Sequence, residues 1–126
     1  MFDSLKSMAS LAGLMKDMPR IKAKFEHVKA ELAETTVKAE EGGGAVSVTA
    51  NGAMQILSVE VHPILLASLV NANAGGNDLG YAQNLIRDCV NAALLKSRQA
   101  AERAIAQAAD DLGIQLPTSM VSGLLS

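Results

Sequence analysis

An apolar stripe near the start of the chain constrains the fold more than any other feature of the sequence. Apolar residues recur there at alternating spacings of three and four, at Leu11, Leu14, Met18, Ile21, Phe25, Val28 and Leu32. This heptad spacing is typical of one face of a long α-helix. A helix over residues 4–35, with Ser4 as its N-cap, would be about 45 Å long. A compact domain of 126 residues needs no helix of that length, so we expect it to protrude or to pair with another helix.

Pro19 lies within this stripe. A proline inside a helix removes one backbone hydrogen bond and clashes with the preceding turn. Because the apolar spacing continues in register through Pro19, we expect the helix to kink there rather than to end.

A three-stranded antiparallel β-meander is predicted after the helix, with strands over residues 35–40, 45–50 and 54–61. The Gly42-Gly43-Gly44 cluster should connect the first two strands. Asn51-Gly52 is typical of a type I′ hairpin turn, in which both central residues have positive φ. The residues expected to share faces are Val46 with Val48, and Leu57 with Val59 and Val61. One face of such a sheet can pack on helices and the other on a partner.

Two helices are predicted in the second half of the chain. Pro63 is placed as the first residue of a short helix over 64–70. After a loop over 71–76, Asn77 or Asp78 should cap a long helix that ends near Leu112, with Gly113 just past its end. Its apolar stripe comprises Val90, Leu94, Ala101, Ile105, Ala108 and Leu112, and beside it lies a face of mainly small residues, Ala82, Ile86, Cys89, Ala93, Ala100 and Ala104. The prediction is one α+β domain over residues 1–126, with a partly ordered tail over 114–126.

Composition excludes several classes of protein. The single cysteine, Cys89, rules out an intrachain disulfide framework and is expected to be a buried structural thiol. The N-terminus has no signal-peptide pattern, and no stretch of about 18 apolar residues predicts a membrane helix. We therefore expect a cytoplasmic protein in a reducing compartment.

Charge is distributed unevenly along the chain, although the formal net charge is only −2. Residues 1–30 carry a net charge of +3, residues 31–86 of −5 and residues 87–103 of +2. Positive charge is therefore concentrated in the two segments predicted to form long helices.

The order of these elements resembles the YbaB/EbfC family of bacterial nucleoid-associated proteins. The resemblance rests on residues 42–52 (GGGAVSVTANG) and 59–66 (VEVHPILL), flanked by the two long helices, and it covers residues 5–118. It implies a homodimer joined through the sheet region, with projecting helices that bind DNA with little sequence preference in the nucleoid. The chain departs from the family pattern at His62, where an acidic residue is common, at Pro19, and in the glycine-rich loop over 73–77.

Phosphate contacts require accessible cationic side chains. The candidates on the two long helices are Lys16, Arg20, Lys22, Lys24, Lys29, Lys96, Arg98 and Arg103. Base readout is not expected, because the chain carries no zinc-finger or helix-turn-helix signature and few aromatic residues. The partners predicted are double-stranded DNA and a second copy of the chain.

Catalysis, a cofactor, a metal, a membrane and a small-molecule substrate are not expected. His27 and His62 are distant in sequence from Cys89 and form no metal-binding spacing, and Gly42-Gly43-Gly44 precedes a strand rather than a helix. The alternative is a dimeric protein-interaction or chaperone-like module that does not bind DNA. Clustering of the cations on one accessible surface of the dimer would favour DNA binding, whereas their scattering, or their pairing with Asp17, Glu26 and Glu102, would favour that alternative.

Overall fold

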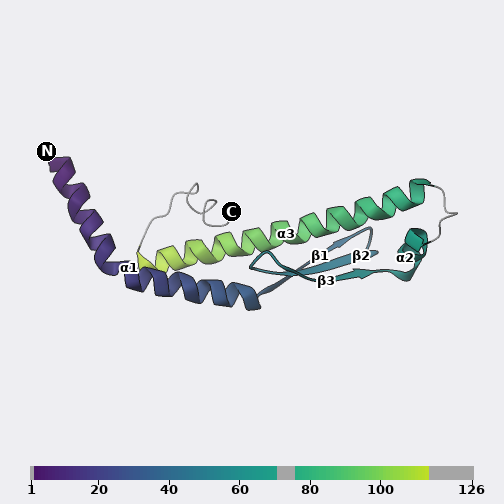
Figure 1. Cartoon of the computed structure of the whole chain (residues 1–126), viewed down its shortest axis with the longest axis horizontal. Helices are drawn as coiled ribbons and strands as arrows, with labels where there is room; N and C mark the ends of the chain where they lie inside the picture. Colours follow the sequence, from purple (N-terminus) through teal and green to yellow (C-terminus); the bar gives the residue numbers. More distant parts are fainter. Residues whose placement is uncertain (1, 71–75, 114–126) are drawn as a thin grey trace.

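A computed structural model describes residues 2–70 and 76–113, and side-chain surroundings within 15–67 and 79–113. The elements are α1 (Phe2–Glu34), β1 (Thr36–Glu41), β2 (Val46–Asn51), β3 (Ile56–Val61), α2 (Pro63–Val70) and α3 (Gly76–Leu112). The molecule is elongated: α3 runs along most of its length, the sheet and α2 lie against one part of α3, and α1 lies beside the other (Figure 1). The predicted fold class and order of elements are confirmed.

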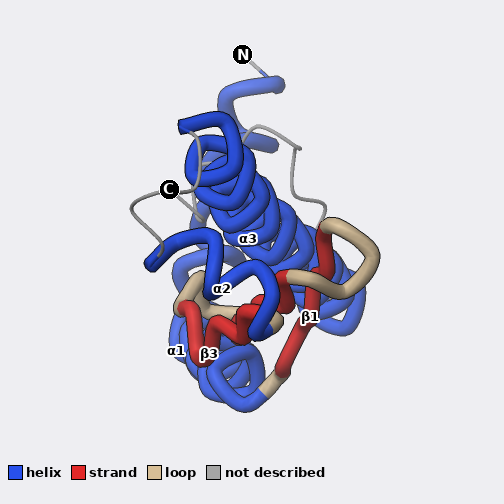
Figure 2. Tube along the Cα trace, turned by 90° about the vertical axis from the view of Figure 1, so that its right-hand side faces the viewer, coloured by secondary structure: helices blue, strands red, loops and turns tan. Residues whose placement is uncertain are grey.

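Small side chains allow α3 to lie close to the sheet. The strands are ordered β1-β2-β3 and both pairings are antiparallel. Val46, Val48 and Ala50 of β2 are fully buried, and they pack against Ala82, Cys89, Ala93 and other residues of one core cluster. Figure 2 shows α3 above the strands, with α2 at the end of the sheet. The predicted small-residue face of the second long helix therefore covers the sheet along its first half, from Ala82 to Ala93, whereas Ala104 of that face packs with α1.

The first helix bends partway along its length (Figure 1). It continues through Pro19 as expected, and the proline accounts for a bend in this part of the helix because it cannot donate a hydrogen bond to the preceding turn. The predicted N-cap is wrong, because α1 begins at Phe2 and contains Ser4 within its first turn. The side chains of the stripe before Met15, including Leu11 and Leu14, lie outside the described ones.

The hairpin between β2 and β3 forms where Asn51-Gly52 predicted it, but the turn type is wrong. Four residues connect the strands, and the residue with positive φ is Met54 (φ 64) rather than Gly52. Asn51 Oδ1 accepts hydrogen bonds from the amides of Ala53 and Gln55, both at 3.0 Å, and so closes a longer turn. Asparagine favours this geometry because its side chain can mimic a backbone acceptor.

A β-bulge interrupts the pairing of β2 with β3. Val59 and Val61 pair with Val48 and Val46 and so share their face, as expected. The register shifts at Thr49/Ala50, so Leu57 is the extra residue of the bulge and has no directly opposite partner.

Helix ends elsewhere follow the expected chemistry with small shifts. His62 precedes α2, and its Nδ1 accepts a hydrogen bond from the Ile64 amide at 3.2 Å. Gly113 has φ 71 and its amide donates to the Asp110 carbonyl at 3.0 Å, as a C′ glycine does. The third helix begins at Gly76, one or two residues before the predicted caps. The predicted loop falls largely on 71–75 and the predicted tail on 114–126, both outside the described residues.

Candidate nucleic-acid interface

The two cationic segments of the sequence are brought together by antiparallel packing of α1 on α3. Val28 and Leu32 of α1 pack with Ala101 and Ala108 of α3, and Phe25 and Ala104 lie against this cluster. We call this pair, α1 from residue 16 and α3 from residue 96 onward, the arm. It occupies the end of the molecule opposite α2 (Figure 1). All eight predicted DNA-binding residues lie on the arm.

Four of the eight cations are free to meet phosphate. Lys16, Lys22 and Lys29 of α1 and Arg103 of α3 are exposed, and none is in an ion pair with any side chain that the structure describes. An exposed cation that is not already neutralised by a carboxylate can release counterions when it contacts DNA. These four residues are therefore the strongest candidates on the arm.

Three of the cations are paired with carboxylates. Arg20 lies 3.8 Å from Asp17, and Arg98 donates to Glu102 at 3.2 Å, both pairs within one helix and largely exposed. Lys24 lies 3.2 Å from Asp111 and joins α1 to the end of α3. Hydrogen bonds from Gln107 and then from Lys24 lower the pKa of Asp111 below its ordinary value. Lys24 thus holds the arm together in addition to carrying charge.

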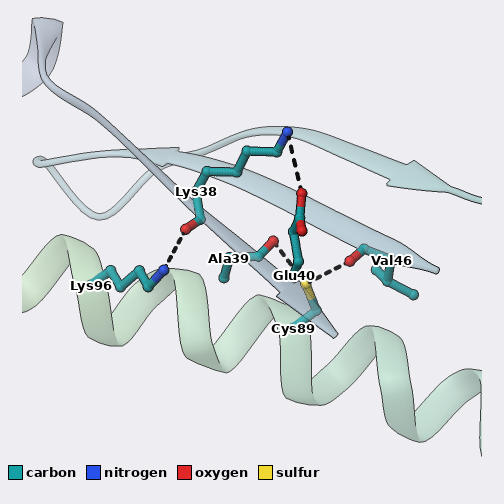
Figure 3. Close-up of polar contacts among 6 residues, drawn as sticks. All are labelled: Lys38, Ala39, Glu40, Val46, Cys89 and Lys96. Carbon is teal, nitrogen blue, oxygen red and sulfur yellow. Dashed lines mark hydrogen bonds and ion pairs between the residues drawn. The ribbon is translucent and has the colours of Figure 1, made fainter. Parts of the chain in front are cut away.

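Lys96 is engaged with the backbone of the sheet. Its Nζ donates to the Lys38 carbonyl of β1 at 2.7 Å (Figure 3). The Lys38 side chain itself lies 3.6 Å from Glu40. Lys96 therefore stabilises the contact between α3 and β1, which sequence spacing alone did not indicate.

The eight cations do not all share one face of either helix. Lys22 and Lys29 are seven residues apart and share a face of α1, whereas Lys24 is about 160° away around the helix. On α3, Lys96 and Arg103 share a face as predicted, whereas Arg98 lies about 140° from Arg103. The structure therefore does not gather the eight residues onto one surface of a single protomer.

A groove that the sequence analysis missed lies beside Lys22 and Lys29. It has a volume of about 400 Å³ and is bounded by α1, the turn at residues 52–54 and α3. Its walls come from segments about 20 to 50 residues apart in the chain, so no local pattern in the sequence could indicate it.

Cys89 has the structural role expected of it. Its side chain is fully buried, and its Sγ lies 3.3 Å from the Ala39 carbonyl and 3.5 Å from the Val46 carbonyl (Figure 3). Burial raises the pKa of the Cys89 thiol above its ordinary value, and the charges of Glu41 and Glu40 act in the same direction. Such a thiol is a poor nucleophile at neutral pH.

His27 and the glycine cluster make local contacts. His27 is exposed beside Glu31 at 2.9 Å, and Gly42, Gly43 and Gly44 all have positive φ in the β1–β2 connection. Among the described residues, no three His, Cys, Asp or Glu side chains are grouped closely enough to hold a metal ion. None of the described helices is both long and apolar enough to cross a membrane.

Comparison with known proteins places this geometry in a family. Residues 8–112 match the YbaB/EbfC DNA-binding family. A nucleoid-associated protein of Moorella thermoacetica is 33% identical over 100 residues, covering 79% of this chain and 88% of that protein. A nucleoid-associated protein of Anaeromyxobacter dehalogenans is 33% identical over 104 residues, covering 82% of this chain and 91% of that protein.

A solved structure shares the fold. The crystal structure of the uncharacterized protein HP0035 from Helicobacter pylori superposes with a TM-score of 0.59 at 19% sequence identity, covering 79% of this chain and 92% of that one. The resemblance first indicated by the glycine cluster, the hairpin and the proline-led helix is confirmed: the chain belongs to the YbaB/EbfC DNA-binding family.

Proposed function

We propose that this protein binds double-stranded DNA in the nucleoid with little sequence preference, through cationic arms presented by a homodimer. The observation that carries the proposal is the set of four exposed cations on the arm, Lys16, Lys22, Lys29 and Arg103, none of which is in an ion pair with a described side chain. Membership of a DNA-binding family supports the same ligand. Contacts of this kind read the phosphate backbone and carry no base information.

A chain of net charge −2 can bind DNA in this way because the charges act locally. At physiological salt, charges separated by more than about 8–10 Å are largely screened from one another. Of the acidic middle of the sequence, Glu40, Glu41 and Glu60 lie on the strands and away from the arm, whereas Glu31 and Glu34 lie on α1. The arm carries eight basic and seven acidic residues, so a duplex would contact its unpaired cations rather than a large net charge.

Two features favour the alternative, a protein-interaction module: the ion pairs at Arg20, Lys24 and Arg98, and the spread of the eight cations over more than one face of each helix. Exposed ion pairs contribute only about 0–1 kcal/mol to stability and are weakened by salt. Arg20 and Arg98 can therefore exchange their carboxylates for phosphates at little cost. These two features do not outweigh the four unpaired cations and the family match, so DNA binding is the better supported function.

An uncovered apolar patch on β3 and the adjoining part of α3 supports the homodimer. The third helix packs mainly over β1 and β2. Val59 of β3, which shares the face that α3 covers, therefore remains 45% exposed, and Ile56 is 38% exposed. Val90 and Leu94 on the adjoining part of α3 are half-buried. Uncovered apolar surface at an edge strand is a typical association site. We therefore place the dimer contact on this apolar patch, on the same sheet face as α3, rather than on the polar outer face.

A matched pair of variants tests the dimer. Val59→Asp puts a charge into the apolar patch, whereas Ser58→Asp puts the same charge on the outer face of the same strand. Sedimentation equilibrium should show the Val59 variant as a 13.1 kDa monomer and the Ser58 variant as a dimer. Circular dichroism confirms that both remain folded. Two variants that dimerise equally well would place the interface elsewhere.

DNA binding is tested by titration against a random duplex at about 50 and about 200 mM salt. Lys22→Glu/Lys29→Glu removes two free cations from the arm. Lys38→Glu/Arg87→Glu is the control, because it changes net charge equally at residues off the arm. The arm variant should bind more weakly and lower the slope of log K against log salt by about two for each protomer in contact.

The outcomes separate the two functions. A loss of DNA affinity confined to the arm variant supports phosphate contact through α1. An equal loss in both variants would show that only net charge matters, and no binding by the unmodified protein at low salt would overturn the DNA proposal and leave the protein-interaction module.

A further inference from the structure

The turn between β2 and β3 caps the end of α1. The last carbonyls of a helix have no hydrogen-bond partner within the helix itself. The Gly52 amide donates to the Leu32 carbonyl at 2.8 Å and to the Thr35 carbonyl at 2.9 Å. Asn51 Nδ2 donates to the Ala33 carbonyl at 3.3 Å. At the base of the arm, α1 is therefore fastened to the sheet by this turn as well as by the continuous chain.

Asn51 connects the turn to α1 with its side chain, which is buried. Its Oδ1 accepts from the amides of Ala53 and Gln55, whereas its Nδ2 donates to Gln55 Oε1 at 2.8 Å and to the Ala33 carbonyl. The oxygen thus closes the turn, and the nitrogen reaches the helix. A carboxylate in place of this amide group would keep the first role and lose the second, because a carboxylate accepts hydrogen bonds but cannot donate them.

Ser97 holds the same turn from α3. Its side chain is fully buried, and its Oγ accepts from the Met54 amide at 3.1 Å and donates to the Asn51 carbonyl at 2.6 Å. Met54 has a φ of 64, in the left-handed region, which costs a non-glycine residue free energy. Such a conformation persists only where the surrounding contacts hold it. The turn is therefore tied to both helices of the arm, to α1 through Asn51 and to α3 through Ser97.

Farther along the arm, the contact between α1 and α3 has few features that fix the orientation of α1. The α3 residues in its apolar cluster are all alanines, Ala101, Ala104 and Ala108. The angle between two helices is fixed by side-chain ridges that pack into grooves, and alanines form only low ridges. Near the end of α3, Lys24 and Asp111 form one partly exposed ion pair, which contributes little to stability. The orientation of α1 is therefore set mainly at the turn.

Three of the four cations that are unpaired among the described side chains lie on α1: Lys16, Lys22 and Lys29. We infer that Asn51 and Ser97 are positioning residues for DNA binding, which fix α1 in one orientation against α3 and so present these cations to a duplex as a set. A preorganised surface binds more tightly than a mobile surface with the same charges, because less conformational freedom is lost on binding. This role rests on the proposed function of DNA binding.

A matched pair of charge changes tests Asn51. Asn51→Asp keeps the shape of the side chain, and its carboxylate accepts from the turn amides but repels the Ala33 carbonyl. Gln55→Glu is the control, because it adds the same charge to the same turn and still accepts from Asn51 Nδ2. At about 50 mM salt, Asn51→Asp should bind a random duplex about fivefold to tenfold more weakly than Gln55→Glu, which is the effect of losing one hydrogen bond. The slope of log K against log salt should be the same for both variants, because the same cations remain.

Ser97→Ala tests the same role from α3 without a change of charge, and it provides the test if Asn51→Asp does not fold. Its control is Ser58→Ala, which removes an exposed hydroxyl from the outer face of β3. Circular dichroism establishes that each variant is folded at the temperature of the titration. Ser97→Ala should bind DNA more weakly at an unchanged salt slope, whereas Ser58→Ala should bind as the unmodified protein does.

The distance between the two helices gives a readout that a loss of stability alone would not change. Ala30→Cys on α1 and Ala106→Cys on α3 place spin labels at exposed positions, and the fully buried Cys89 stays unlabelled. An excess of unlabelled protein restricts the measured distance to one protomer. Asn51→Asp should broaden the distribution of distances relative to Gln55→Glu, and added DNA should narrow it again.

The outcomes separate this role from the proposed function. Weaker binding and a broader distribution of distances in Asn51→Asp, but not in Gln55→Glu, support positioning by the turn. Equal affinities of these two variants would overturn the inference and leave DNA binding intact, as would weaker binding with an unchanged distribution of distances. A lower salt slope for Asn51→Asp would also overturn it, because phosphate contacts would then have been lost. No binding by the unmodified protein would refute the proposed function and this role with it.

Discussion

Gly52 marks the closest approach of the hairpin to α1, and its replacement by alanine makes a quantitative prediction. A Cβ at this position would lie 2.6 Å from Leu32 Cδ2 and 2.9 Å from the Leu32 carbonyl oxygen. Carbon atoms in contact prefer about 3.5–4.0 Å. The leucine methyl can rotate away, but the carbonyl belongs to the last turns of α1 and can move only with the helix.

The magnitude follows from the contacts that such a movement disturbs. Overpacking at a tight site costs about 1–3 kcal/mol. The Gly52 amide also donates to the carbonyls of Leu32 at 2.8 Å and Thr35 at 2.9 Å, and weakening one such bond costs about 0.5–1.5 kcal/mol. We expect Gly52→Ala to lower the free energy of unfolding by about 2–3 kcal/mol, which for a domain of this size lowers Tm by about 8–12 °C.

Thermal unfolding at a fixed protein concentration measures this effect, with Gly80→Ala as the matched control. Gly80 lies inside α3, and a Cβ there would meet nothing within 4 Å. The same substitution should therefore stabilise the protein by about 0.5–1 kcal/mol through helix propensity. If Gly52→Ala unfolds at or above the temperature of the unmodified protein, the argument that steric contact requires glycine at this position is refuted.

Three further outcomes are expected. Ser97→Ala should cost about 1–3 kcal/mol in urea unfolding, because it leaves the Met54 amide and the Asn51 carbonyl without their hydrogen-bond partner; a cost below about 0.5 kcal/mol would contradict this. His62→Asp should raise stability by about 0.5–1 kcal/mol, since a carboxylate at the N-cap of α2 accepts the same amide and favours the helix dipole; a lower midpoint would show that the histidine makes a better cap. The pKa of Asp111 is lowered in the folded state, so the stabilisation that its carboxylate gives is present above the ordinary aspartate pKa and is lost as pH falls through the lowered pKa. Asp111→Asn should therefore reduce the free energy of unfolding at pH 7 and match the unmodified protein at low pH. Lys24→Met, which removes the partner of Asp111, should show the same pH dependence.

The sequence predicted those parts of the fold that are set by the local spacing of apolar residues and by residues that end helices or form turns. The heptad spacing around Phe25 and Val28 predicted the buried side of α1, and the alternation at Val46 and Val48 predicted the buried side of β2. Gly113 ended α3 for the reason expected. Each of these signals depends on residues within a few positions of one another.

Features that depend on distant partners were not predictable in the same way. Gly52 was interpreted as a residue needing positive φ, but its small size matters because Leu32 lies against it. The cations on the arm were recognised, but the sequence did not show that Lys24 pairs with Asp111 or that Lys96 donates to a strand carbonyl, because those partners come from other elements. The bulge that displaces Leu57 likewise follows from a pairing of two strands.

The antiparallel packing of the arm also determines when, during synthesis, α1 can first pack against its partner helix. The first helix is translated first, yet its packing partners Ala101 and Ala108 are among the last residues of α3 to be made. At about 5–20 residues per second, the ribosome needs about 3–15 s to travel from the end of α1 to these residues. For that time the apolar side of a nascent α1 has no partner in its own chain, so neighbouring chains on one messenger can meet through their first helices before either has folded.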